Sequence, residues 1–481
     1  MIKLPPVNWL VLLPAIIPTF TGLLVLCWDL GLKTEEHNRL AWAGIIGLVI
    51  TAVVSFCLLG RNELAFNGSI VLDSYAMFFN LVFCFAGILT LLMSISYLNT
   101  AGIHAGEYYA LILFAIVGMV VMAAATDLIN IFLGLETMSM AVYALAGIWR
   151  QRLQSNEAAL KYFLLGAFAS GFLLYGIALI YGATGSIQLG HIATYVDQNG
   201  GSTMLLIGVA MLIVGFGFKV AAAPFHVWTP DVYEGSPTTV TAFMAVGVKA
   251  AAFASFARVF MHTLGSLHGQ WEGIFWVLAV LTMTVGNITA IVQNNIKRML
   301  AYSSVAHAGY LLVAMVAGKE LGGAALMYYL VAYGLMTLGA FAVIIAVGRK
   351  GEPNEEFSDF AGLGFRYPLL AMAMTVFMLS LTGVPPLVGF TGKFYIFSAA
   401  VKAGYIWLAV IGVLNSVISA YYYVRVIVNM YMYEGEKMPE KLSARPALAV
   451  AILVAAAGTV LLGVFPAASI ALARTSFLSL G

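Results

Sequence analysis

Charged side chains are scarce in this sequence. Only 9% of its 481 residues are Asp, Glu, Lys or Arg, whereas 62% are hydrophobic. A soluble domain carries about 25% charged residues, so this composition excludes an ordinary soluble protein. A membrane-spanning helix needs about 20 apolar residues in a row. The sequence therefore predicts an all-α integral membrane protein that lies in a lipid bilayer.

Motifs for metals, cofactors and nucleic acids are also missing. Cys27, Cys57 and Cys84 lie in apolar runs without the spacing of a zinc or iron–sulfur site. There is no Gly-x-Gly-x-x-Gly, no P-loop and no His-Glu-x-x-His. The formal net charge is only +2, which gives no broad basic surface for a nucleic acid. We expect no metal, no cofactor and no nucleic-acid partner.

Apolar run length and loop punctuation predict about fourteen transmembrane helices. They cover 8–29, 40–60, 71–98, 108–126, 128–148, 158–182, 203–233, 238–261, 272–293, 299–316, 323–347, 367–400, 404–430 and 447–466. The seventh and twelfth runs are too long for one straight helix. Each has proline in its middle, Pro224 in one and the pair Pro385 and Pro386 in the other. We expect both to be interrupted helices.

The positions of these prolines suggest an internal repeat. A unit of five spans can recur with inverted orientation. After an odd number of spans the chain lies on the opposite side of the membrane, so the second copy starts from that side. The predicted divisions are three N-terminal helices in 1–105, two inverted five-helix repeats in 106–265 and 266–432, and a last span in 433–481. Inverted repeats with broken helices are typical of transporters. The alternative is that the prolines only kink two packing helices.

Lysine and arginine in the loops predict the orientation of the chain in the membrane. Twelve follow odd-numbered spans: Lys33, Arg39, Arg150, Arg152, Lys297, Arg298, Arg349, Lys350, Arg366, Lys437, Lys441 and Arg445. Six lie on the other side: Lys3, Arg61, Arg258, Lys319, Lys402 and Arg474. Since positive charge accumulates in the cytoplasm, we expect both termini on the opposite, periplasmic side.

Four ionisable residues lie well inside the apolar runs: Glu136, Lys219, Lys249 and Lys393. A charge inside the membrane is costly, so such residues indicate a function. An amine held away from water gives up its proton more easily than one in solution, and a nearby carboxylate opposes that release. The four residues therefore predict a path for protons. The alternative is that they form static ion pairs or snorkel to the membrane surface.

Three further residues are candidates for the same path. His226 follows Pro224, and His307 lies in the run AYSSVAHAGYLL. Histidine exchanges protons near neutral pH. Lys161 begins its apolar run, so an interface anchor and a relay residue are equally good interpretations.

Three stretches resemble motifs of a known family. They are AAAPFHVWTPDVYEGSPTTVTAFMAVGVKAAAF from Ala221 to Phe253, GLETMSMAVYALAG around Glu136, and AYSSVAHAGY around His307. The chain is similar over nearly its whole length to the antiporter-like membrane subunits of respiratory complex I. Those subunits are related to subunits of multisubunit cation/proton antiporters. The resemblance implies the same fold of fourteen helices with two inverted five-helix repeats.

The resemblance also implies roles for individual residues. Glu136 and Lys219 would form the carboxylate–lysine pair of a first channel, and Lys249 would connect two half-channels. Lys393 would be the terminal lysine, with His307 on the link towards it. One branch of the family places a glutamate where this chain has Lys393, and another continues into a long lateral helix where this chain ends at Gly481. These differences favour the third branch.

The expected function follows from the resemblance. The chain would be a subunit without redox centres in a proton-translocating NADH:quinone oxidoreductase of the bacterial inner membrane. Other membrane-arm subunits would be its partners, and quinone reduction elsewhere would drive the protons. Two alternatives remain, a subunit of a cation/proton antiporter or of a related membrane-bound hydrogenase-type complex, and a membrane scaffold whose charges only hold helices together. A plastid origin and additional transport of Na⁺ also stay open.

Overall fold

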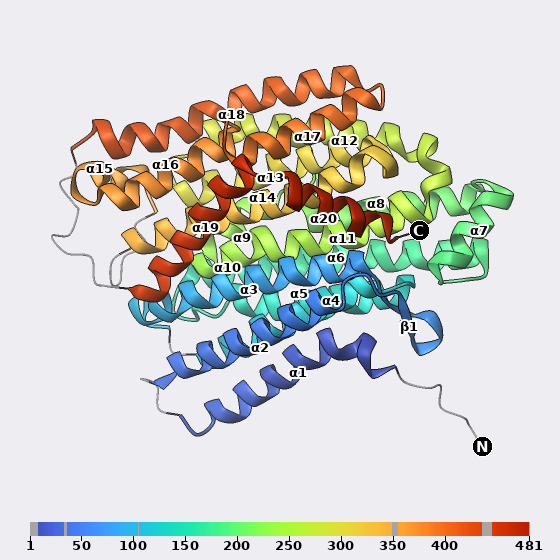
Figure 1. Cartoon of the computed structure of the whole chain (residues 1–481), viewed down its shortest axis with the longest axis horizontal. Helices are drawn as coiled ribbons and strands as arrows, with labels where there is room; N and C mark the ends of the chain where they lie inside the picture. The colour runs from blue at the N-terminus through green and yellow to red at the C-terminus, as the bar shows by residue number, and fades with distance from the viewer. Residues whose placement is uncertain (1–7, 33–35, 104, 349–354, 435–444, 481) are drawn as a thin grey trace.

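The structure is a computed structural model that describes residues 8–32, 36–103, 105–348, 355–434 and 445–480. Long helices lie side by side, with α1 and α2 at one edge of the bundle and α18 at the other (Figure 1). Helix α19 crosses the bundle obliquely. In a bilayer every backbone polar group must be satisfied within the protein, which is why nearly the whole chain is helical.

The helices of the first part of the chain are α1 (Trp9–Asp29), α2 (Asn38–Cys57), α3 (Ser74–Ala101), α4 (Glu107–Ala124), α5 (Leu128–Ala146), α6 (Leu153–Thr184) and α7 (Leu189–Asn199). The central part contains α8 (Thr203–Val220), α9 (Thr229–Gly235), α10 (Thr238–Phe243), the π-helix η3 (Met244–Val248), α11 (Lys249–Ala257), the π-helix η4 (Arg258–Thr263), the short 3-10 helix η5 (Gly265–Leu267), α12 (His268–Ile291), α13 (Ile296–Val316) and α14 (Gly318–Val347).

The last part contains the 3-10 helix η6 (Phe357–Phe360), α15 (Leu363–Arg366), α16 (Pro368–Thr382), α17 (Val388–Lys402), α18 (Ile406–Met432), α19 (Pro446–Val464) and α20 (Ala467–Leu478). Between α2 and α3 lies a small antiparallel hairpin of β1 (Glu63–Ala65) and β2 (Ile70–Leu72), joined by the 3-10 turn η2 (Phe66–Gly68).

The predicted spans agree with these helices. Within the described ranges, thirteen helical segments are long and apolar enough to cross a membrane. The remaining predicted span, the twelfth at 367–400, corresponds to α16 and α17, which are shorter. The prediction of an all-α membrane protein with about fourteen spans is therefore confirmed. Helix α7 and the separate α20 were not predicted.

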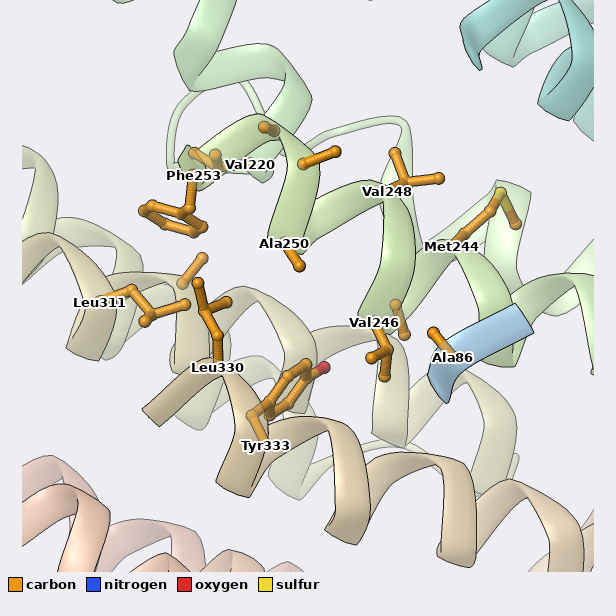
Figure 2. Packing of buried hydrophobic residues seen from close by; sticks show 14 of the residues in the cluster. Ala86, Val220, Met244, Val246, Val248, Ala250, Phe253, Leu311, Leu330 and Tyr333 are labelled. Atoms are coloured by element: carbon orange, nitrogen blue, oxygen red, sulfur yellow. The ribbon is translucent and has the colours of Figure 1, made fainter. Parts of the chain in front are cut away.

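The centre of the bundle is α14 together with the segment from α10 to η4. An apolar stretch of 18 residues within that segment is entirely buried. Helix α14 contacts α3, α13, α16, α17, α19 and α20. Figure 2 shows this packing, with Val246, Ala250 and Phe253 directed towards Leu330 and Tyr333 of α14. By contrast, the outer helices expose large apolar side chains, such as Trp407 of α18 and Leu453 of α19. Such a surface suits lipid or neighbouring membrane helices.

Candidate functional site

Both predicted helix breaks are present. Helix α8 ends at Val220, where Ala221 adopts left-handed backbone angles, and eight residues separate it from the start of α9 at Thr229. Helix α16 ends at Thr382, where Gly383 is left-handed, and α17 begins at Val388. The prolines lie in these gaps, as their missing N–H groups require.

Lys219 lies at the end of α8, immediately before the first break. Its side chain is buried, and the amine donates to Ser139 Oγ at 2.7 Å and to the Tyr143 hydroxyl at 3.1 Å, both on α5. The rings of Tyr143 and Tyr162 also lie within 6 Å of Nζ, at 5.2 and 5.8 Å. The amine is therefore held by neutral hydroxyl groups and aromatic faces.

Glu136 is on the same helix as the groups that hold Lys219, but it does not contact the lysine. Its carboxylate accepts a hydrogen bond from Ser170 Oγ of α6 at 2.5 Å. Among the described residues, no ion pair within 4.0 Å joins Glu136 and Lys219. Ser139, one helical turn after Glu136, accepts the lysine's hydrogen bond instead. The two residues of the predicted pair are therefore separated, with Ser139, one turn of α5 away from Glu136, in contact with Lys219.

Lys249 lies where the π-helix η3 joins α11. It is buried, and its Nζ donates to the carbonyl oxygen and to Oγ of Ser304 on α13, at 2.5 and 2.6 Å. The Tyr333 ring is 5.7 Å away. The neighbouring residues Val248 and Ala250 lie within the apolar packing of Figure 2. Ser304 therefore supplies both hydrogen bonds that the structure gives this amine.

His307 follows Ser304 by one turn of α13. Its Nδ1 lies 2.6 Å from the Tyr329 hydroxyl and its Nε2 3.0 Å from the Tyr423 hydroxyl. The ring of Tyr310 is 5.5 Å from the His307 ring and 4.9 Å from Lys393 Nζ. Helix α13 thus brings together the surroundings of Lys249, His307 and Lys393.

Lys393 lies in the second turn of α17, beyond the second break. Its Nζ donates to the carbonyl oxygens of Leu381 and Thr382, each at 2.9 Å, and to Ser416 Oγ at 2.8 Å. The two carbonyls are at the end of α16, where a helix leaves its last acceptors without intrahelical partners. The break therefore creates the oxygens that hold this amine.

A groove between α17 and α18 leads to Lys393. Its volume is about 870 Å³, and its walls are mainly apolar side chains, among them Phe390, Phe394, Val413 and Val417. Lys393 and Ser416 are among its few polar lining residues. Apolar walls with few polar groups are usual for a ligand pocket or a site of helix packing.

The two secondary candidates occupy other positions. Lys161 is 41% exposed and pairs with Glu157 at 2.7 Å and with Asp231 at 2.8 Å. His226 is half-buried in the first break, and the described structure gives it no hydrogen bond to the other candidates. Lys161 therefore belongs to a group of surface charges rather than to the buried row of amines.

Sequence reasoning missed the partners of the buried amines. Ser139 and Tyr143 lie three and seven residues after Glu136, on one face of α5, so helical periodicity could have pointed to them. Tyr329 and Tyr423 gave no such signal, because α14 and α18, which carry them, meet α13 only in the folded chain. Within the described residues, no group of three or more His, Cys, Asp or Glu side chains could hold a metal ion.

Comparison with known proteins identifies the family. Residues 125–419 match the family model for the transmembrane part of NADH:quinone oxidoreductase and Mrp antiporter proteins. The chain is 51% identical to NADH-quinone oxidoreductase subunit N of Trichlorobacter lovleyi, over 96% of this chain and 95% of the relative. The NADH-quinone oxidoreductase subunit N of Chloroflexus aggregans is 46% identical, over 100% and 99%. This chain belongs to the NADH-quinone oxidoreductase subunit N family.

A solved structure supports the same assignment. A chain of respiratory complex I from Thermus thermophilus is 36% identical and superposes with a TM-score of 0.82, over 95% of this chain and 98% of that one. The branch of the family favoured by Lys393, which is the subunit N branch, is therefore confirmed.

Two cations that we assigned to loops are in fact buried in this member of the subunit N family. Arg258 is 4% exposed and pairs with Asp73 at 2.9 Å, and Lys297 is fully buried and pairs with Glu355 at 2.9 Å. Each is buried because a carboxylate compensates its charge. The count of loop cations that predicted the orientation therefore loses one residue on each side of the membrane.

Of the other loop cations in that count, six lie outside the described part of the chain: Lys3, Lys33, Arg349, Lys350, Lys437 and Lys441. The chain end at Gly481 does so too.

Proposed function

We propose that this chain is a proton-translocating membrane-arm subunit of an NADH:quinone oxidoreductase. One observation carries the proposal. In the described part of the chain, none of the three buried amines of Lys219, Lys249 and Lys393 has a carboxylate within 4.0 Å. A buried amine held only by neutral oxygens gives up its proton readily, whereas a neighbouring carboxylate favours the charged form and holds the proton more firmly.

The proposed route follows the order of the contacts. Lys219 exchanges its proton next to the first break, and the distance to Glu136 controls how firmly the proton is held. Lys249 receives the proton at Ser304. His307 and the tyrosines around it lead to Lys393, whose groove opens at the surface. Water molecules would complete the steps that hydrogen bonds do not span.

The driving reaction belongs to other subunits. Quinone reduction would change the conformation of neighbouring membrane-arm subunits, and this change would move α5 relative to Lys219. The chain itself would hold no redox centre and no cofactor. We place it in the bacterial inner membrane, with both termini on the periplasmic side, as the loop charges indicate.

We also retain the division into 1–105, two inverted repeats of 106–265 and 266–432, and 433–481. Two features support it. Each break begins with a left-handed residue, Ala221 in the first and Gly383 in the second. The first two helices of each unit also approach closely at glycine. A Cβ on Gly118 of α4 would lie 2.5 Å from the Met138 nitrogen, and one on Gly286 of α12 would lie 2.6 Å from the Ala306 nitrogen.

Replacement of Lys219 by methionine tests the proposal. Methionine preserves the length and apolar stem of the side chain but cannot carry a proton. In the complete complex reconstituted into vesicles, we expect Lys219→Met to lower the initial rate of NADH-driven proton transfer about tenfold or more. Lys319→Met, near the start of α14 and away from the proposed route, should leave the rate unchanged. Wild-type proton transfer in assembled Lys219→Met complexes would overturn the proposal.

Cation/proton exchange is a second candidate, because the matching family model also covers Mrp antiporter proteins. The chain would then exchange Na⁺ for H⁺ without a redox partner. Vesicles containing the purified chain under a sodium gradient distinguish the two functions. Exchange that persists with quinone-site inhibitors favours the antiporter, whereas proton transfer that requires quinone reduction favours the oxidoreductase subunit.

A further inference from the structure

The buried ion pair of Lys297 and Glu355 lies outside the route described above. Lys297 is in the first turn of α13, and its fully buried Nζ is 2.9 Å from Glu355 Oε1. Glu355 is held in place by its backbone, because its carbonyl accepts from the Ile296 N–H at 2.7 Å. Arg152, whose side chain is 18% exposed, approaches the same carboxylate at 4.0 Å. The pair therefore lies just beneath the surface, where Arg152 meets solvent.

Helix α9 connects this pair to Lys249. Lys297 Nζ also donates to the carbonyl of Ser236, at the end of α9, at 2.7 Å. Tyr233, one turn earlier on α9, interacts with the Ser304 hydroxyl. Ser304 accepts both hydrogen bonds from Lys249. The last turn of α9 thus lies alongside the segment of α13 that separates the two amines.

The distance between Lys297 and Ser304 along α13 is short enough for a relay of a few groups. Lys297 and Ser304 are seven residues apart on α13, which corresponds to about 10 Å along the helix axis. Ser236, whose carbonyl accepts from Lys297, also has a fully buried hydroxyl with no hydrogen-bond partner among the described residues. Buried hydroxyl groups nearly always have a partner, and a bound water is the usual one where protein groups are lacking.

We propose that Glu355 and Lys297 form the portal through which Lys249 exchanges protons with the aqueous phase. The inference rests on the proposed function. In the uptake direction, Glu355 takes a proton from water and passes it to the neutral Lys297 amine. Lys297 then gives a proton through water and the hydroxyls of Tyr233 and Ser304 to Lys249. Each donor loses one proton and each acceptor gains one, so no redox partner is needed.

A second buried ion pair in the same molecule, Arg258 with Asp73, shows which cation a purely structural ion pair contains. Arg258 Nη2 donates to both carboxylate oxygens of Asp73, at 3.1 and 2.9 Å, and to the Ala123 carbonyl at 2.8 Å. A guanidinium is never deprotonated in a protein, so this pair only holds helices together. The pair next to Ser236 uses lysine, which can lose its proton.

Arginine at position 297 therefore separates the two interpretations. Lys297→Arg keeps the positive charge and the carboxylate partner but removes proton exchange. In complete complexes in vesicles, we expect normal assembly. The initial rate of NADH-driven proton transfer should fall by about tenfold or more. Lys319→Arg, near the start of α14 at the other end of α13, is the matched control and should transfer protons at the wild-type rate. Wild-type transfer by Lys297→Arg would overturn the portal.

A second variant decides the matter if arginine does not fit the site. Glu355→Gln has the same shape but cannot take up a proton, so we expect the same loss in assembled complexes; a wild-type rate would again overturn the portal. Lys249→Met, measured in parallel, separates this result from the proposed function. If Lys249→Met also transfers protons normally, the proposed function fails. If only Lys297→Arg and Glu355→Gln transfer normally, the portal alone fails.

Discussion

Lysine and arginine have different tasks in this chain. Among the described residues, Lys219, Lys249 and Lys393 have buried amines without a carboxylate partner, and each donates to neutral oxygens. Lys393 shows the arrangement most clearly, because its partners are two carbonyls at the end of α16 and the Ser416 hydroxyl. At such a residue a proton can leave without breaking an ion pair, which makes its transfer easier.

Lys393→Arg tests this property at one residue. Arginine carries the same charge but does not release its proton. We expect the complex to assemble and proton transfer to fall about tenfold or more, as measured by the initial rate of acidification in reconstituted vesicles. Lys319→Arg, near the start of α14, is the control. Equal rates for both variants would show that position 393 needs only a positive charge.

Arg258→Lys tests the opposite case. The single Nη2 of Arg258 makes three hydrogen bonds, two of them to Asp73. A lysine amine at this position loses the planar, fixed geometry of the guanidinium group. We expect the free energy of unfolding in detergent to fall by about 1–3 kcal/mol, with proton transfer per assembled complex unchanged. Loss of transfer without loss of stability would contradict a structural role.

Glu356 makes a pH-dependent prediction. Partial desolvation, together with the nearby carboxylates of Asp359, Glu234 and Glu355, raises the pKa of this largely exposed carboxyl group, which lies outside the membrane spans. A carboxyl group with a raised pKa in the folded state destabilises the fold once the pH exceeds its unfolded value, about 4.3. Glu356→Gln should therefore unfold at a higher temperature than wild type at pH 7–8. The difference should vanish near pH 4, and a difference that grows on acidification would contradict the assignment.

At the scale of elements, the two helix breaks determine where the site lies. Gly383 has φ of 96°, and a Cβ there would lie 3.1 Å from Lys393 Cδ. Ala221, at the equivalent place in the first break, has φ of 61° although it is not glycine. Left-handed angles cost an L-residue with a side chain about 1–2 kcal/mol. The two breaks thus place the same conformational demand on a glycine in one case and on an alanine in the other.

The matched pair Gly383→Ala and Ala221→Gly tests this demand. We expect Gly383→Ala to lower the free energy of unfolding by about 1–2 kcal/mol and to displace Lys393, so that proton transfer falls too. Ala221→Gly relieves the backbone but adds freedom to the unfolded chain, so stability should change by less than about 1 kcal/mol. Thermal unfolding of both purified variants is the measurement. Equal destabilisation would show that the breaks do not depend on these angles.

At the scale of the whole molecule, the sequence predicts the spans well because the bilayer permits little besides helices. Several helices exceed the predicted apolar runs. Helix α6 covers 153–184 rather than 158–182, and α14 begins at Gly318 rather than 323. The polar ends of these helices stay helical outside the apolar layer, where hydropathy gives no signal. The breaks were predictable because proline leaves a helix few alternatives.

The candidate site was only half predictable for a physical reason. Buried charges are conspicuous in an apolar sequence, so Glu136, Lys219, Lys249 and Lys393 could be recognised without a structure. Their partners are serines, tyrosines and carbonyls, which occur throughout the chain and are selected only by tertiary packing. Lys297 was misplaced because Glu355, which compensates its charge, is 58 residues away.

The number of protons moved per electron pair tests the central claim most directly. Complete complexes carrying Lys249→Met should be reconstituted beside wild type, with NADH oxidation and vesicle acidification recorded together. If the buried amines carry protons through this subunit, the ratio of protons to electrons falls, because a route through Lys249 is interrupted. An unchanged ratio at wild-type rates of NADH oxidation would contradict the account.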